Sequence, residues 1–81
     1  MHCTVLLFAQ LAESIGSDRL TIKLKDGATI EDALQELGSQ HEIIASMRDA
    51  LAVAIDDRYY KRTTSLNDGD TLALIPPVSG G

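Results

Sequence analysis

Alternating apolar and polar positions along the chain predict five short strands. Residues 3–8 (CTVLLF) are aliphatic and β-branched, and such a run favours extended backbone. Residues 20–24 (LTIKL) alternate strictly, so one side of that strand is apolar and the other is polar. We expect three further strands at 52–55 (AVAI), 59–62 (YYKR) and 71–75 (TLALI). Turn-forming residues precede the last two of these strands, at 56–58 (DDR) and 67–70 (NDGD).

Apolar residues at helical spacing predict three helical segments. Residues 9–16 form the first, which is only a turn or two long and ends at a glycine. The clearest helix begins at Thr29, which we expect to be the N-cap, with Asp32 completing a capping box. Gly38 is predicted to end this helix in a left-handed conformation. A second, weaker helical pattern covers residues 41–51.

This order of elements predicts the fold class. The chain is expected to form one α+β domain over residues 1–75, with one main helix packed on one face of a mixed sheet. A first pair of strands followed by a crossing helix is the pattern of the β-grasp, the fold of ubiquitin. Residues 76–81 are then expected to form a separate, flexible C-terminal tail.

One face of the predicted sheet lacks a helix to cover it. If the first and last strands are neighbours, alternation places four apolar side chains on that face: Leu6, Phe8, Ala73 and Ile75. An exposed apolar patch on a small protein usually marks a surface that binds a partner. The alternative is that the second helical segment, or a loop, folds over the patch.

Composition narrows the class of protein. The 81 residues are enough for one domain, and 44% apolar with 4% aromatic residues predicts a mainly aliphatic core. Twelve acidic against seven basic residues give a net charge of −5, which argues against nucleic acid or an anionic membrane and permits a basic partner groove. Cys3 is the only cysteine, so no internal disulfide and no cysteine cluster for a metal are expected. With no basic leader and no long apolar run, we expect a cytoplasmic protein.

The last six residues, PPVSGG, have an unusual composition for the end of a domain. Pro76 and Pro77 end the last strand and favour a stiff, extended backbone. The remaining residues carry small side chains or none: Val78, Ser79, Gly80 and Gly81. Such a tail is suited to threading into a narrow active site, where ATP would convert its carboxylate into a reactive acyl-adenylate. A sulfur donor, a thiol or a lysine would then attack. The simpler alternative is a ragged end without chemistry.

Three segments together resemble a known family. These are LLFAQLAESIG, DGATIEDAL and, above all, NDGDTLALIPPVSGG. They resemble the small subunit of molybdopterin synthase, a ubiquitin-like sulfur carrier, over almost the whole chain from Val5 to Gly81. The resemblance implies a reactive carboxylate on Gly81, preceded by Gly80 in a tail that is threaded from residue 76 onward. It also implies an apolar partner surface on Phe8 and Ile75, extended to Tyr59. Residues 56–62 depart from the family by carrying a more charged turn.

The resemblance further implies a reaction and two protein partners. An adenylyltransferase related to ubiquitin-activating enzymes would use ATP on Gly81, and sulfur transfer would give a thiocarboxylate. The tail would then enter the active site of the large synthase subunit and give its sulfur to cyclic pyranopterin monophosphate. Two deliveries complete the dithiolene that binds molybdenum or tungsten. This chain is expected to bind no cofactor and to be a non-catalytic, sulfur-donating subunit within a heterotetramer.

Other candidates for chemistry are weaker. Adjacent Asp56 and Asp57 are more typical of a turn than of a metal pair, and His2 and His41 lack the spacing of metal ligands, so no metal site is predicted. Cys3 is a candidate sulfur acceptor, but it falls on the predicted core face, where a thiol is usually inert. The charged, aromatic run RYYKR is too short to predict a nucleic-acid surface on an acidic protein.

Three functions therefore remain open. The first is the molybdopterin sulfur carrier. The second keeps the carrier chemistry but changes the acceptor, to thiamine thiazole synthesis, tRNA thiolation or conjugation to lysines. The third is a β-grasp interaction module whose glycine tail has no chemistry. A residue added after Gly81 separates carrier from module, because it would abolish carrier activity and leave a module unchanged.

Overall fold

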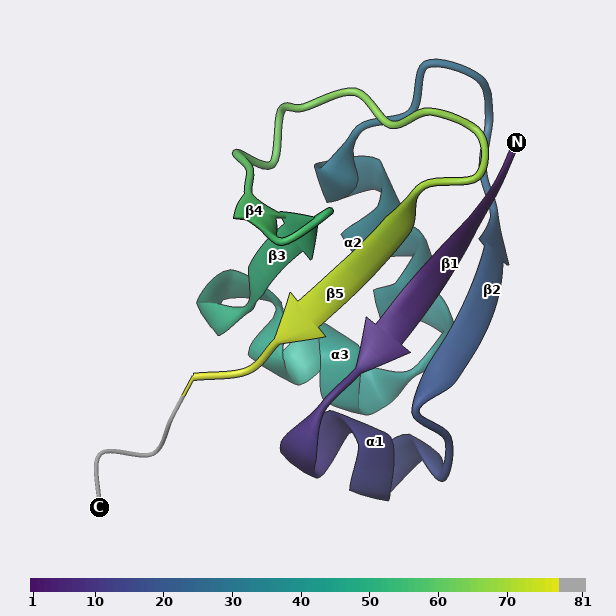
Figure 1. Ribbon diagram of the computed structural model, residues 1–81. Helices are drawn as coiled ribbons and strands as arrows, with labels where there is room; N and C mark the ends of the chain where they lie inside the picture. Colours follow the sequence, from purple (N-terminus) through teal and green to yellow (C-terminus); the bar gives the residue numbers. More distant parts are fainter. Residues whose placement is uncertain (78–81) are drawn as a thin grey trace.

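The computed structural model describes residues 1–77 of the chain. These residues form a five-stranded sheet with its helices gathered on one side, as Figure 1 shows. The elements are β1 (His2–Leu7), α1 (Ala9–Ile15), β2 (Arg19–Lys23), α2 (Ile30–Gln40), α3 (Glu42–Met47), the 3₁₀ helix η1 (Arg48–Ala50), β3 (Ala52–Ile55), β4 (Arg58–Tyr59) and β5 (Thr71–Ile75). The predicted α+β class and mixed sheet are confirmed.

The strands are arranged in the order β2-β1-β5-β3-β4. β1 and β5 lie side by side at the centre and are parallel, with Val5 opposite Leu72 and Leu7 opposite Leu74. The other three pairings are antiparallel. Because β1 and β5 run in the same direction, both end at the same edge of the sheet (Figure 1). Phe8 and Pro76, the residues that follow these two strands, therefore leave the sheet at that edge.

The core lies between the sheet and the helices. Helix α2 supplies its main apolar stripe, and the strands supply every second residue, as the alternation of buried positions in β1 and β5 shows. The fully buried large side chains come from both layers: Val5, Leu11, Ile30, Leu34, Leu37, Ile44, Leu72 and Leu74. Ile44 places α3 in this same core, so neither α2 nor α3 covers the opposite face of the sheet.

Helix α2 begins as predicted and ends later than predicted. Thr29 is the N-cap, and its hydroxyl accepts from the Asp32 amide while the Asp32 carboxylate accepts from the Thr29 amide, which completes the capping box. The prediction that Gly38 ends the helix is wrong, because α2 continues through Gln40. A Cβ at Gly38 would lie 3.4 Å from the Ala45 Cα, so glycine here lets α2 and α3 approach closely. Gly38 is thus a packing residue and not a helix terminator.

A tight hairpin joins β3 to β4. Asp56 and Asp57 form its two-residue loop and have φ values of 51° and 65°. Positive φ at both loop residues is the type I′ geometry that matches the twist of a two-residue hairpin, and Asp tolerates it better than most residues. The predicted strand over 59–62 is corrected here, because β4 contains only Arg58 and Tyr59. The segment that follows leaves the sheet to contact α2.

Ion pairs hold that returning segment against the helices. The Arg62 guanidinium donates to the Leu51 carbonyl at 3.1 Å and lies 3.7 Å from the Glu31 carboxylate. Arg48 also pairs with Glu31. The Arg62 carbonyl in turn accepts from the Glu31 amide at 2.9 Å, which satisfies one free N–H of the first turn of α2. These contacts fix the base of the β3–β4 hairpin.

Candidate functional site

The face of the sheet opposite the helices carries a continuous apolar row. Strand pairing places Leu6 opposite Ala73, Ala73 opposite Ala54, and Ala54 opposite Tyr59, so the row crosses β1, β5, β3 and β4. Ile75 lies on this face two residues beyond Ala73. The predicted placement of Leu6, Phe8, Ala73 and Ile75 outside the helix-covered core is confirmed by their exposure, and the helices and loops of the described chain do not fold over the row.

A shallow groove of about 230 Å³ lies on this open face and extends to the edge of the sheet where β5 ends. We call it the Phe8 groove. Its lining comes from three strands, the junction between β1 and α1, and the hairpin turn: Phe8, Ala54, Asp57, Tyr59, Ala73 and Ile75. Phe8 and Tyr59 are the large exposed side chains of this lining, with 46% and 68% of their surfaces accessible to solvent. Aromatic side chains this exposed contribute little to the fold and are typical of sites that bind another protein.

Phe8 owes its position to the junction between β1 and α1. It is the N-cap of α1, with extended backbone (φ −129°, ψ 156°) and no side-chain capping bond. The next residue, Ala9, has φ 51°, a left-handed conformation that is unusual for alanine. The chain therefore turns sharply after Phe8 and leaves its ring on the surface. Phe8 also lines a second hollow of about 290 Å³ on its other side, with Leu6 and Arg19.

The C-terminal segment leaves the sheet beside this groove. Ile75, the last residue of β5, lines the groove. Pro76 is buried and Pro77 is exposed. The other predicted tail residues lie outside the described residues: Val78, Ser79, Gly80 and Gly81. Their assignment to a threaded tail with a reactive carboxylate on Gly81 stays a prediction.

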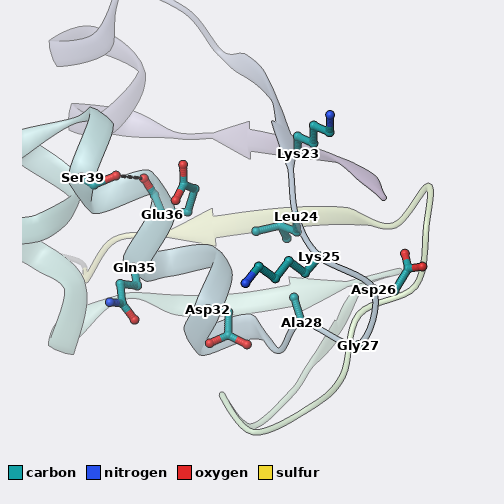
Figure 2. A pocket seen from close by; sticks show the side chains of 10 residues that line it. All are labelled: Lys23, Leu24, Lys25, Asp26, Gly27, Ala28, Asp32, Gln35, Glu36 and Ser39. Carbon is teal, nitrogen blue, oxygen red and sulfur yellow. Dashed lines mark hydrogen bonds between the residues drawn. The ribbon is translucent and has the colours of Figure 1, made fainter.

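A larger hollow than the Phe8 groove lies elsewhere and contains none of the predicted site residues. It is open, has a volume of about 620 Å³, and lies between α2 and the loop after β2 (Figure 2). Its lining carries charges of both signs, from Lys23, Lys25, Asp26, Asp32 and Glu36. Asp32 is already used by the capping box of α2. We assign no ligand to this hollow, because it has mixed charge and lacks a built polar centre.

The structure also bears on the other residues considered for chemistry, Cys3 and the possible metal ligands. Cys3 is buried with 1% of its surface exposed, as its predicted place on the core face requires. Burial, and then the nearby Asp70 and Asp68 carboxylates, raise the pKa of the Cys3 thiol, so its reactive thiolate form is disfavoured. Within residues 1–77, no three His, Cys, Asp or Glu side chains gather as a metal site would require. Among the described helices, none has the length and apolar character needed to cross a bilayer.

Comparison with known proteins identifies the family. A model of the ThiS family matches residues 5–81. The chain belongs to the ThiS family. A molybdopterin synthase sulfur carrier subunit of Chlamydomonas reinhardtii is similar, with 36% identity over 83 residues and full coverage of both chains. The family expected from the sequence is therefore confirmed.

Solved structures of related proteins agree with this ThiS-family assignment. The crystal structure of SAMP1 from Haloferax volcanii is similar with a TM-score of 0.85 and 32% identity, and all of both chains is covered. A second similar structure is the protein–protein complex of subunits 1 and 2 of the molybdopterin-converting factor from Helicobacter pylori. One chain of that complex matches with a TM-score of 0.69 and 27% identity, again over all of both chains. The β-grasp fold predicted from the sequence is confirmed by these likenesses.

The structure adds two residues to the site that sequence reasoning missed. Ala54 and Asp57 line the Phe8 groove of this ThiS-family chain, but neither was predicted to do so. Ala54 could not be assigned to the open face from sequence, because the run AVAI does not reveal which of its residues face the helices. Asp57 was interpreted only as a turn residue. The hairpin register, which places Ala54 opposite Tyr59, would have found Ala54. No alternation along the chain points to Asp57, because it lies in the turn.

Proposed function

We propose that this chain is the sulfur carrier subunit of a molybdopterin synthase, and that its working group is the carboxylate of Gly81. The single observation that carries the proposal is the position of the Phe8 groove. An exposed apolar groove lies at the edge of the sheet where β5 ends and the C-terminal segment begins. A partner that binds this groove would receive the tail at a fixed point of entry.

The chemistry of the tail follows from the poor reactivity of a free carboxylate. A Gly81 oxygen attacks the α-phosphorus of ATP, which forms the acyl-adenylate and releases pyrophosphate. A sulfur nucleophile at the oxidation level of hydrosulfide then displaces AMP and leaves a thiocarboxylate. A thiocarboxylate is ionised at neutral pH, and its sulfur is a soft nucleophile. Sulfur passes to the cyclic pyranopterin precursor, and water returns Gly81 to its carboxylate. Two such cycles supply both sulfurs of the dithiolene.

This division of labour assigns little catalysis to the chain itself. Its folded domain supplies a docking surface, made of Leu6 and the residues of the Phe8 groove, and the segment from Pro76 to Gly81 supplies the substrate sulfur. Groups that bind phosphate or move protons are assigned to the large subunit and to the adenylyltransferase. Pairing with a large subunit is supported by a solved structure in which a similar chain belongs to a complex of subunits 1 and 2. The resemblance to the family further implies a heterotetramer of two small and two large subunits.

The decisive experiment is the intact mass of the untagged protein after incubation with ATP, a sulfide source and its adenylyltransferase. We expect a gain equal to the replacement of one oxygen by sulfur, on the peptide that ends in Gly81. A chain with one alanine added after Gly81 is the matched control. It should fold with an unchanged melting temperature and gain no sulfur. If the competent adenylyltransferase adds no sulfur to the normal chain either, the carrier function is wrong.

A second candidate function uses the same activation with another acceptor. The likeness to SAMP1, which is also described in solved structures as a small archaeal modifier protein, favours conjugation to lysines of other proteins. The two are separated by adding either the pyranopterin precursor with the large subunit or a protein extract to the activated chain. Dithiolene formation supports the first function. New high-mass species, cleaved at an isopeptide bond to Gly81, would support the second.

A further inference from the structure

The Phe8 groove contains one charged residue among apolar neighbours. Five of its six lining residues are aromatic or aliphatic, and the sixth is Asp57. Within residues 1–77, the Asp57 carboxylate has neither an ion pair nor a side-chain hydrogen bond, in contrast to Glu31, which pairs with two arginines. Asp57 is exposed, so water satisfies its charge in the free protein. A partner that covers the groove would remove this water from the Asp57 carboxylate.

The hairpin turn directs this charge toward the groove and gives it no internal partner. Asp56 and Asp57 share the type I′ turn, but only Asp57 lines the groove. The nearest cation in the sequence is Arg58, which pairs with Ile55 across the hairpin. Ile55 is buried, and alternation places Arg58 on the same side of the hairpin as Ile55, while Tyr59 and Ala54 face the groove. Arg58 does not line the groove and does not neutralise Asp57 there.

We propose that Asp57 is a specificity-determining residue that pairs with a lysine or arginine of the large synthase subunit when the Phe8 groove is covered. The inference rests on the proposed function, because it assumes that the large subunit is the protein that covers the groove. The physical reason is the cost of desolvation. A carboxylate that loses its water in an apolar interface must gain an opposite charge, since an unpaired buried charge is strongly unfavourable. A large subunit without that cation is therefore rejected.

This pairing also gives the groove a direction. Apolar contacts with Phe8, Ala73 and Ile75 are tolerant of small rotations of the partner, because the hydrophobic effect is not directional. A charge pair at one end of the groove fixes the register of docking. Correct register matters here, because Ile75 and Pro76 must present the following residues to the entrance of the partner's active site. The net charge of −5 strengthens attraction to a basic partner at long range but does not fix the register.

The test compares two neighbouring aspartates. Asp57→Asn and Asp56→Asn each remove one negative charge from the same turn, and asparagine tolerates the positive φ of both positions, so both variants should fold. Each variant is titrated into the purified large subunit from the same organism by calorimetry, at low and at high salt. We expect Asp57→Asn to weaken binding by about tenfold or more, because the partner's cation is left unpaired in the interface. Asp56→Asn should weaken it by about threefold or less, as a solvent-exposed charge does.

The outcomes separate this inference from the proposed function. Equal losses for the two variants would mean that the turn contributes only general charge attraction, and unchanged binding by Asp57→Asn would mean that its carboxylate stays in water. Either result overturns the charge pair while the carrier function stands. A normal chain that fails to bind the large subunit overturns the proposed function and the inference together. A restored affinity when one basic residue of the large subunit is changed to a neutral one, seen only with Asp57→Asn, would identify the partner's cation.

Discussion

The two faces of the central sheet are built from the same strands but differ in burial and in the side chains that they carry. Along β5, Leu72 and Leu74 are buried beneath the helices, while Thr71, Ala73 and Ile75 alternate with them and stay half-buried. The helix-covered face is closed, aliphatic and free of charge. The open face carries the shallow Phe8 groove, whose lining includes two exposed aromatic side chains and the Asp57 carboxylate. Neighbouring residues in one strand therefore meet different requirements: one set decides whether the chain folds, and the other decides what it binds.

The sharpest test of this contrast uses two adjacent residues of β5. Leu74 is fully buried and Ile75 lines the open groove. Leu74→Ala should lower the free energy of unfolding by about 2–5 kcal/mol, because it removes buried methyl groups and leaves a cavity. Ile75→Ala should lower it by roughly 1 kcal/mol, since only part of that side chain is removed from water on folding. Urea denaturation followed by circular dichroism measures both values.

A small domain has little stability to lose, so Leu74→Ala is at risk of being unfolded from the start. In that case Leu74→Val and Ile75→Val give the same comparison with smaller losses. Similar losses at the two positions would contradict the contrast, because they would make Ile75 part of the core. The binding assay completes the test: Ile75→Ala should weaken docking to the large subunit, and a folded Leu74 variant should not.

Periodicity was sufficient to predict the buried face, because burial depends on a repeating pattern that the sequence carries. The core positions of β1, α2 and β5 fall at the expected spacing of two or three to four residues. The end of α2 was not predictable in this way. Gly38 has the composition of a helix terminator, but its role depends on α3, which brings Ala45 to within 3.4 Å of a would-be Cβ. Local rules cannot report a contact made by a second helix.

The next test concerns the aromatic wall of the open face. Phe8→Asp should weaken binding to the large subunit by about 2 kcal/mol or more, as loss of a central aromatic anchor does. It should not unfold the chain, because Phe8 occupies the N-cap of α1 without a capping bond, and aspartate is one of the preferred N-caps. Calorimetric titration and a thermal melt give the two numbers.

Tyr60→Asp is the matched control for this substitution. Tyr60 is an aromatic residue of similar exposure, 40% against 46% for Phe8, and it does not line the groove. Its variant adds the same negative charge and should bind nearly as well as the normal chain. If Tyr60→Asp is as damaging as Phe8→Asp, the added charge and not the lost ring explains the effect. If Phe8→Asp unfolds the protein, the two faces have been assigned wrongly.

The open face was only partly predictable from sequence, for a physical reason. Alternation within a strand was sufficient to predict that Leu6, Phe8, Ala73 and Ile75 lie on the open face, because successive residues of a strand point to opposite sides. The residues that complete the groove come from the β3–β4 hairpin, and their place depends on strand order and register. Tyr59 came only from the resemblance to a family, and Asp57 was missed because a turn residue shows no alternation. The residues after Pro77 remain predicted from composition and resemblance alone.

The smallest expected effect belongs to Cys3, on the buried face. Burial and nearby carboxylates raise the pKa of the folded thiol, so the thiolate forms more easily in the unfolded chain. Stability from this source is therefore complete below the unfolded pKa of about 8.5 and is lost as pH rises above it. The melting temperature of the normal chain should fall more between pH 7 and 10 than that of Cys3→Ala, because other titrating groups are common to both. Parallel melting curves with pH would instead mean that the Cys3 thiolate is as well solvated in the folded protein as in the unfolded one, and the closed face would have to admit water at its N-terminal end.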